Sequence, residues 1–186
     1  MNQEEVAYRK VPSSFGHLTI VWRHDESGPL LMEILLPSRQ ARLHQVAAPR
    51  AQDTSIDRLC GAIRDYLEGN DVELATQLLD WGRCSVFQTA VLEAEMSVPR
   101  ERVSSYSALA AHLGKPRASR AVGTALARNP FPLIVPCHRT VRSDGSLGGY
   151  GGGLEMKRAL LEMEGVGFDP MGRVRPEFFW DWGAAS

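Results

Sequence analysis

The strongest chemical signal in the sequence is a cysteine followed directly by a histidine, with carboxylates later in the chain. Cys137 precedes His138, and either Glu162 or Glu164 could supply the carboxylate. A thiolate is the reactive form of cysteine, and a histidine supported by a carboxylate is a usual way to generate one. Side chains of neighbouring residues on an extended chain point to opposite sides, so we expect a water molecule to bridge Cys137 and His138. The pattern favours a nucleophilic cysteine over a thiol buried only for packing.

The residues on both sides of Cys137 indicate a pocket. The apolar run Leu133–Val135 stands between prolines, and we predict that it is a buried extended segment that brings Cys137 to a pocket wall. Residues 145–153 then contain six glycines, which would let a ligand approach the backbone closely. This stretch lacks the GxxxxGK[ST] pattern, so it is not a phosphate-binding loop of that type.

Charge is segregated along the chain, although the net charge is only −1. No Asp or Glu occurs from Arg102 to Ser143, and the acidic residues gather outside this acid-free window. Such segregation favours a surface that faces phosphates, and therefore a polyanionic partner. The cations of the window are Arg102, Lys115, Arg117, Arg120, Arg128, Arg139 and Arg142.

Two short helices are predicted inside this window, over residues 105–114 and 117–129. Two short helices joined by a brief connection with a glycine are typical of a helix-turn-helix motif. The second helix consists mainly of small residues, and Arg120 and Arg128 are its long ones. The small residues either allow close helix packing or make the helix slim enough to enter a DNA groove while an arginine reaches into the base stack. The sequence leaves both interpretations open.

The first third of the chain is predicted to be an α/β domain. Apolar runs at His17–Arg23 and Leu30–Leu36 flank turn residues and predict a hairpin. Residues 37–53 have no clean period and are predicted as a loop that could include a strand. Residues 55–69 have helical periodicity, with Cys60 on the apolar side as a buried structural thiol. Residues 70–84 are a connector that could contain a strand, and the domain boundary is placed there, giving domains 1–82 and 83–186.

The remaining elements of the second domain follow from capping and periodicity. Ser85 and Gln88 have capping-box spacing and predict a helix that ends before Pro99. A final helix is predicted over 154–165, with its leucines (Leu154, Leu160 and Leu161) inward. The tail 166–186 is aromatic-rich, and we expect it to pack on the body of the domain.

Cysteine content and the chain start bear on the compartment. The three cysteines form no CxxC pair, which argues against a disulfide framework and for a reducing compartment. The first residues are polar and include acids, unlike a signal or transit peptide, and no apolar run is as long as a membrane helix. A cytoplasmic location is expected, and a nucleoid-associated or nuclear protein would have the same features.

Four stretches together resemble, in order and spacing, the O6-alkylguanine-DNA alkyltransferases, also called methylated-DNA–protein-cysteine methyltransferases. They are FQTAVL (87–92), VPRERVSSYSALA (98–110), SRAVGTALARNPFPLIVPCHR (119–139) and GSLGGYGGGLEMKRALLEMEG (145–165). The resemblance implies a small ribonuclease-H-like α/β domain, with a sheet and a helix, followed by a mainly α domain with a winged-helix-like helix-turn-helix.

The resemblance also implies roles for individual residues. Cys137 would accept the alkyl group, His138 would act as the base through a water, and Glu164 would orient His138. Asn129 would hold the turn, and Tyr106 would contact the target phosphate and the flipped base. Arg120 would fill the gap left in the duplex. The other implied DNA-binding residues are Ser119, Ala121, Gly123, Thr124 and Arg128, and the implied guanine pocket is lined by Leu126, Pro132, Thr140, Tyr150 and Gly151.

The implied partner is double-stranded DNA that contains O6-alkylguanine, bound through the minor groove by a monomer. O4-alkylthymine is a second substrate that the resemblance leaves open. The implied reaction needs no cofactor and ends in an S-alkylcysteine, so one turnover per molecule is expected. No zinc site is expected, because the first fifty residues contain no cysteine. The family often has Trp at Leu92, Gly at Glu101 and Ser or Ala at Gly151, and the last difference would widen the pocket.

Two other classes of function compete with alkyl transfer. A non-catalytic lesion binder or helix-turn-helix regulator would use the same DNA-binding elements, but relatives that only bind lesions have lost the cysteine that Cys137 supplies here. A cysteine hydrolase would use the same thiol, but would have no need of the acid-free window. Both hypotheses rank behind the alkyltransferase.

Overall fold

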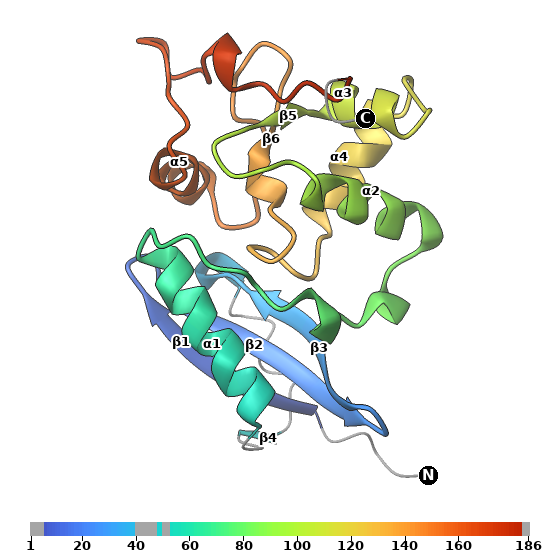
Figure 1. The fold of residues 1–186 in the computed structure, drawn as a ribbon, viewed down its shortest axis with the longest axis vertical. Coiled ribbons are helices and arrows are strands. Elements are labelled where there is room, and N and C mark those ends of the chain that lie inside the picture. Colours follow the sequence, from blue (N-terminus) through green and yellow to red (C-terminus); the bar gives the residue numbers. More distant parts are fainter. Residues whose placement is uncertain (1–5, 40–47, 50–52, 184–186) are drawn as a thin grey trace. The chain divides into compact units, whose positions relative to one another are not determined.

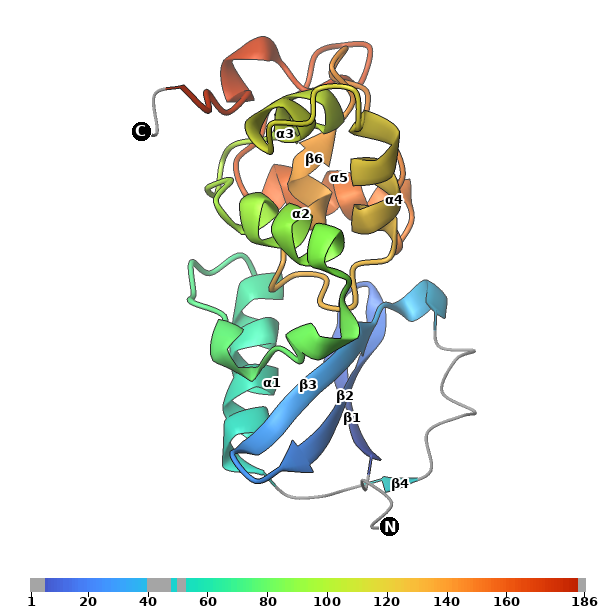
Figure 2. The ribbon, with the colours of Figure 1, turned by 90° about the vertical axis from the view of Figure 1, so that its right-hand side faces the viewer.

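The computed structural model describes residues 6–39, 48–49 and 53–183, which form two compact units (Figures 1 and 2). The N-terminal unit comprises the described residues up to 83 together with 130–134. The C-terminal unit comprises residues 84–129 and the described residues from 135 onward. Within the described ranges, no helix is both long and apolar enough to cross a bilayer.

The N-terminal unit is built on an antiparallel sheet. Strands β1 (Val6–Ser13), β2 (Gly16–Asp25) and β3 (Gly28–Leu35) are joined by tight turns, and the short β4 (Ala48–Pro49) runs parallel to β1. The order across the sheet is β3-β2-β1-β4. The predicted hairpin is confirmed as β2 and β3, and a strand does occur within 37–53, as β4. The rest of that segment, at 40–47 and 50–52, lies outside the described residues.

Strand β1 was missed by sequence reasoning. It pairs with β2 over its whole length, from Val6 opposite Arg23 to Ser13 opposite Gly16. Only Ala7 and Val11 of β1 are buried, and polar residues separate them. With so few apolar side chains, the strand depends on its hydrogen-bonded neighbours, which a local pattern does not reveal.

One helix completes this unit and packs its apolar face into the core. The predicted helix at 55–69 is confirmed as α1 (Thr54–Leu67). It begins at Asp53, whose carboxylate accepts hydrogen bonds from the backbone N–H groups of Ser55 (2.8 Å) and Ile56 (3.1 Å). Its apolar face, including Cys60, is buried as predicted, and the sheet contributes Leu18, Ile20 and Trp22 to the core. In the connector, residues 70–84 are all described and form the 3-10 turns η2 (Thr76–Leu78) and η3 (Trp81–Arg83), and their one strand-like feature is a single parallel β-bridge from Leu79 to Leu31.

The C-terminal unit is mostly helical, as expected. Its helices are α2 (Val86–Met96), α3 (Tyr106–His112), α4 (Ser119–Ala127) and α5 (Leu154–Met163). Two-residue strands β5 (Ser104–Ser105) and β6 (Thr140–Val141) pair in parallel, and the 3-10 turns are η4 (Cys137–Arg139) and η5 (Pro176–Phe178). The helices predicted at 105–114 and 117–129 correspond to α3 and α4.

The start of α2 is capped differently from a complete capping box. Ser85 Oγ accepts a hydrogen bond from the backbone N–H of Gln88 (3.3 Å), so the N-cap is confirmed. The Gln88 amide does not return to Ser85. It donates instead to the carbonyl oxygens of Ala125 (3.3 Å) and Arg128 (3.0 Å). This side chain therefore ties the first turn of α2 to the end of α4.

Two predictions are wrong, one about backbone conformation and one about the burial of a side chain. Residues 131–135 are buried as expected, but Leu133 and Ile134 form a turn, with Leu133 at a φ of +76°, instead of an extended segment. The flanking prolines lack an N–H to donate to a sheet, which disfavours a paired strand here. Leu154, predicted to point inward, is 54% exposed at the first position of α5.

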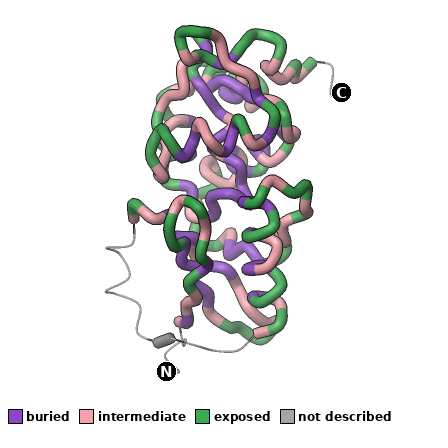
Figure 3. The backbone as a smooth tube through the Cα atoms, turned by 90° about the vertical axis from the view of Figure 1, so that its left-hand side faces the viewer, coloured by how far each residue is buried: buried purple, intermediate pink, exposed green. Residues whose placement is uncertain are grey.

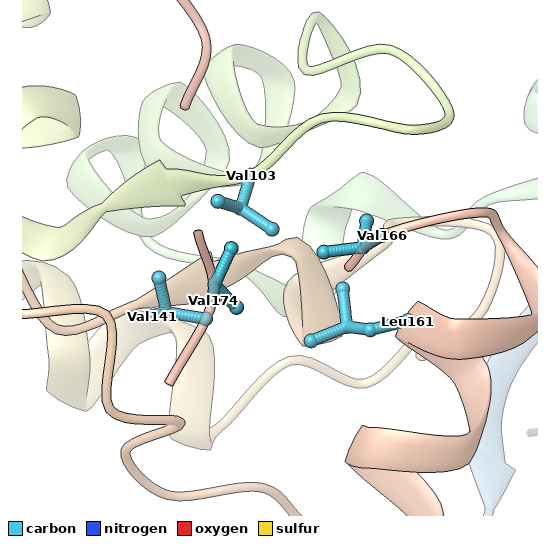
Figure 4. Packing of buried hydrophobic residues seen from close by; sticks show 5 residues of the cluster. All are labelled: Val103, Val141, Leu161, Val166 and Val174. Atoms are coloured by element: carbon cyan, nitrogen blue, oxygen red, sulfur yellow. The ribbon is translucent and has the colours of Figure 1, made fainter. Parts of the chain in front are cut away.

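The core of the C-terminal unit joins segments that are distant in sequence. Figure 4 shows five side chains converging from the segment before β5, from β6, from α5 and from the tail: Val103, Val141, Leu161, Val166 and Val174. Phe178 and Phe179 pack against this cluster, and Trp180 N–H donates to the Val103 carbonyl at 2.7 Å. The prediction that the aromatic tail packs on the domain is confirmed. Figure 3 shows buried backbone running through each unit.

Candidate active site and nucleic-acid interface

Cys137 is the first residue of η4 and is held from two directions. Its backbone N–H donates to the Val135 carbonyl (2.8 Å), and the same carbonyl accepts from the buried Asn129 side-chain amide (3.0 Å). Burial raises the pKa of the Cys137 thiol to about 11, although the Asn129 amide and the Lys157 ammonium favour the thiolate. The resting thiol is therefore protonated at neutral pH, and its reaction requires a base.

His138 is a neutral base held by a buried carboxylate. Its Nε2 lies 3.2 Å from Oε1 of Glu164, and both side chains are fully buried. Burial lowers the pKa of His138 despite the opposing effect of Glu164. An ionised carboxylate can only accept hydrogen bonds, so the network assigns the proton to Nε2 and leaves the lone pair on Nδ1. The η4 turn also replaces the extended geometry from which a water bridge to Cys137 was predicted.

Glu164 is paired twice. Arg139 donates from Nε to Oε2 (2.9 Å) and from a terminal nitrogen to Oε1 (2.7 Å), and its other terminal nitrogen donates to the Val98 carbonyl (2.7 Å). Burial alone would raise the pKa of Glu164, but His138 and Arg139 hold it far below its usual range. The alternative, Glu162, forms an exposed pair with Arg158 instead. Arg139, counted from the sequence among the phosphate-facing cations, is thus occupied inside the unit.

A second buried cluster near Cys137 was missed by sequence reasoning. Thr140 Oγ1 donates to Oε2 of Glu95 at 2.5 Å, and Lys157 Nζ donates to the Thr140 carbonyl at 2.6 Å. Burial raises the pKa of Glu95 to about 7 and lowers that of Lys157 to about 8. Both residues lie on the buried faces of their helices, Glu95 one turn after Val91 and Leu92 in α2, and Lys157 one turn before Leu160 and Leu161 in α5. A charged residue at an apolar helical position was the signal that could have identified them.

Tyr106 lies against the glycine-rich stretch. A Cβ at Gly148 would stand 2.8 Å from the Tyr106 hydroxyl oxygen, and Gly148 has a φ of +67°, so glycine is required there. Burial, with Glu95 and Cys137 adding to it, raises the pKa of the Tyr106 phenol, which stays a proton donor at neutral pH. The Tyr150 ring meets the His138 ring edge-on, with centroids 6.3 Å apart.

Comparison with known proteins places this site in one family. The family model for the DNA-binding domain of 6-O-methylguanine DNA methyltransferase matches residues 86–166. A methylated-DNA–protein-cysteine methyltransferase of Methanothermobacter thermautotrophicus is 45% identical over 62% of this chain and 64% of its own length. One from Mycobacterium bovis is 36% identical over 86% of this chain and 92% of its own. The chain belongs to the 6-O-methylguanine DNA methyltransferase family.

A solved structure of the same kind supports this assignment. The crystal structure of Mycobacterium tuberculosis OGT in complex with DNA has a TM-score of 0.65 to this chain and 36% sequence identity. The match covers 85% of this chain and 92% of that one.

In this family member, α4 has an outward face with no acidic residue. Arg120, Ala121, Thr124 and Arg128 are exposed, and Thr124 donates back to the Arg120 carbonyl (3.1 Å). Ser119 and Gly123 are partly buried, and a Cβ at Gly123 would contact the Tyr106 ring at 3.6 Å. The small residues of α4 therefore divide between an outward face and a packed one.

The remaining predicted pocket residues differ in placement. Thr140 and Leu126 are buried in the C-terminal unit, and Gly151 is partly buried there. Pro132 belongs to the short segment 130–134, which clusters with the N-terminal unit. The C-terminal unit thus contains every predicted site residue except Pro132.

Proposed function

We propose that Cys137 is the alkyl acceptor of this protein and that His138, supported by Glu164, is its base. As a member of its family, the chain is a methylated-DNA–protein-cysteine methyltransferase, a DNA repair protein that removes alkyl groups from O6 of guanine. The observation that carries the proposed roles is the neutral imidazole of His138, held by a buried carboxylate, in the residue next to a protonated thiol.

The reaction moves the alkyl group from O6 of guanine to sulfur, and the thiol proton is replaced by one on the guanine ring. Nδ1 of His138 takes the thiol proton through a water, Sγ of Cys137 attacks the alkyl carbon, and the bond from that carbon to O6 breaks. The leaving guanine gains a proton on its ring from the protonated Tyr106 phenol. The His138 imidazolium then returns a proton to Tyr106. The products are an S-alkylcysteine and guanine.

Single turnover follows from the product. A thioether carbon carries no leaving group that water displaces readily at neutral pH, so the alkylated protein is not regenerated. Each molecule therefore repairs one base.

The chain binds DNA, and we propose the minor groove as its site. The family and the DNA complex of a relative support DNA binding, and the acid-free outward face of α4 supports this element as the contact. In this proposal α3 and α4 form a winged-helix-like helix-turn-helix. Arg120 fills the gap left by the flipped base, and Asn129 keeps the turn before Cys137. Ser119, Ala121, Gly123, Thr124 and Arg128 follow the groove.

The flipped base is proposed to lie among Tyr150, Gly151, Thr140 and Leu126 of the C-terminal unit. The protein acts as a monomer with domains 1–82 and 83–186, the first ribonuclease-H-like. The proposed location is cytoplasmic or nucleoid-associated.

A duplex with a radiolabelled methyl group on O6 of one guanine tests the proposed acceptor. The label should move to wild-type protein and to Cys60→Ser and Cys84→Ser variants, but not to Cys137→Ser. A duplex with O4-methylthymine tests the second substrate. Tight binding of the modified duplex with no transfer of label would favour a non-catalytic lesion binder instead.

A further inference from the structure

Glu95 is a buried carboxyl to which the proposed mechanism gives no role. It lies on the buried side of α2 with no exposed surface. Its Oε2 accepts the hydrogen bond from Thr140 Oγ1, whereas Oε1 is also buried and has no hydrogen-bond partner among the described residues. A buried carboxylate with a single hydrogen bond is poorly compensated, so the environment favours the neutral acid.

Charged and titratable groups of three neighbouring elements act on Glu95. Lys157 approaches from α5, Arg139 and Cys137 from η4, and Tyr106 from α3. Lys157 forms no direct hydrogen bond to Glu95 among the described contacts, because its three N–H groups go to the carbonyls of Thr140, Leu147 and Gly149. The ammonium is thus satisfied by carbonyls and leaves Glu95 without a direct counterion.

Thr140 connects Glu95 to the nucleophile. Its hydroxyl donates to Glu95 and its carbonyl accepts from Lys157, in the residue that directly follows the η4 turn of Cys137. The hydroxyl can donate to either charge state of Glu95, so ionisation leaves this bond in place and changes the charge. That charge acts on Cys137, where an ionised Glu95 disfavours the thiolate.

We propose that Glu95 is a positioning residue for alkyl transfer, whose carboxyl anchors Thr140 behind Cys137 and whose ionisation opposes formation of the Cys137 thiolate. This inference rests on the role proposed for Cys137. The protein then has two forms near neutral pH, a faster one with neutral Glu95 and a slower one with ionised Glu95. The burial that brings the pKa of Glu95 to about 7 places the change within the physiological range.

A Glu95→Gln variant separates charge from anchoring, because the amide oxygen can still accept from Thr140 but the side chain cannot ionise. Two rates are measured from about pH 6 to about pH 9: methyl transfer from an O6-methylguanine duplex, and alkylation of Cys137 by iodoacetamide without DNA, read by peptide mass spectrometry. The ratio of the variant rate to the wild-type rate should be near one at the acid end. It should rise about tenfold at the alkaline end if the charge raises the thiol pKa by about one unit.

Two further variants serve as controls for this experiment. Glu93→Gln removes an exposed carboxylate from the same helix and should keep the wild-type pH profile. Glu95→Leu also cannot ionise, so the ratio of its rate to the wild-type rate should rise in the same way toward alkaline pH. Its rate should be lower at every pH, because Thr140 loses its hydrogen-bond acceptor. A ratio that stays constant across the pH range in both assays would overturn the proposal. If no methyl group is transferred to Cys137 but the rate ratio for iodoacetamide alkylation still rises with pH, then Glu95 acts on Cys137 as proposed and Cys137 is not the alkyl acceptor.

Discussion

The C-terminal unit contains two regions with a buried carboxyl group, and the pKa values of these two groups are shifted in opposite directions. In the first, Glu164 is paired with His138 and Arg139, and its pKa lies far below normal. In the second, Glu95 has one hydroxyl donor, and burial raises its pKa to about 7. Hydrogen-bonded opposite charge keeps a buried carboxylate ionised, and burial without it favours the neutral acid. The first region is therefore a fixed support for the base, and the second can change charge near neutral pH.

Breaking the first region should have the largest effect. Glu164→Gln leaves the Arg139 charge without its partner and removes the carboxylate behind His138. We expect the free energy of unfolding to fall by about 4 kcal/mol, as when one member of a buried ion pair is removed. Methyl transfer should slow by about 100-fold, the lower end of the usual contribution of a general base. Urea unfolding and single-turnover kinetics measure the two losses.

Glu162→Gln is the matched control for this change. Glu162 lies two residues earlier and forms an exposed pair with Arg158, which should contribute less than about 0.5 kcal/mol. Equal losses in the two variants would mean that the buried network around Glu164 has no special role.

The two regions should also make opposite contributions to the pH dependence of stability. The depressed pKa of Glu164 gives stability that is present above its unfolded pKa and is lost in acid. The raised pKa of Glu95 gives a stabilising contribution that is fully present below its unfolded pKa of 4.5 and is lost as the pH rises toward about 7. Relative to wild type, Glu95→Gln should therefore gain about 3 kcal/mol of unfolding free energy between about pH 4.5 and pH 8.

Urea unfolding of both proteins at the two ends of this pH range measures that gain. Glu93→Gln, which changes an exposed carboxylate of the same helix, should show no pH-dependent difference from wild type. Parallel pH curves for wild type and Glu95→Gln would show that Glu95 ionises normally in the folded protein, and the contrast between the two regions would be lost.

The smallest expected effect concerns the link within the second region. Thr140→Val keeps the side-chain shape but removes the one hydroxyl that donates to Glu95 among the described residues. We expect a loss of about 1 kcal/mol in unfolding free energy, the usual net value of one hydrogen bond. With that donor gone, the pKa of Glu95 should rise further, so the slowing of Cys137 alkylation should move to higher pH. A midpoint that moves to lower pH would contradict the assigned donor.

What the sequence could predict depended on whether the signal was local. Strands β2 and β3 and helix α1 follow from periodicity, and Cys137 with His138 follows from the chemistry of adjacent residues. Residue chemistry alone left Glu162 and Glu164 as alternatives, and the family resemblance favoured Glu164. The structure shows that Glu164 is the one that faces His138.

Other features depend on contacts between distant segments. Glu95 and Lys157 stand 62 positions apart and meet through Thr140, so neither charge alone predicts the cluster. The turn at Leu133 and the inward position of Arg139 were missed for the same reason. Apolar content predicted the burial of residues 131–135, but the prolines favour a turn over an extended strand there. The Arg139 guanidinium points inward because it pairs with the Glu164 carboxylate.

Intact-mass analysis tests the central claim most directly. Wild-type protein is mixed with an excess of duplex that carries one O6-methylguanine, and the modified residue is located by peptide mapping. We predict that all of the protein gains the mass of one methyl group, that the group lies on Cys137, and that repaired guanine equals protein in amount. Repaired guanine in excess of protein, or a methyl group on any other residue, would contradict a single-turnover transfer to Cys137.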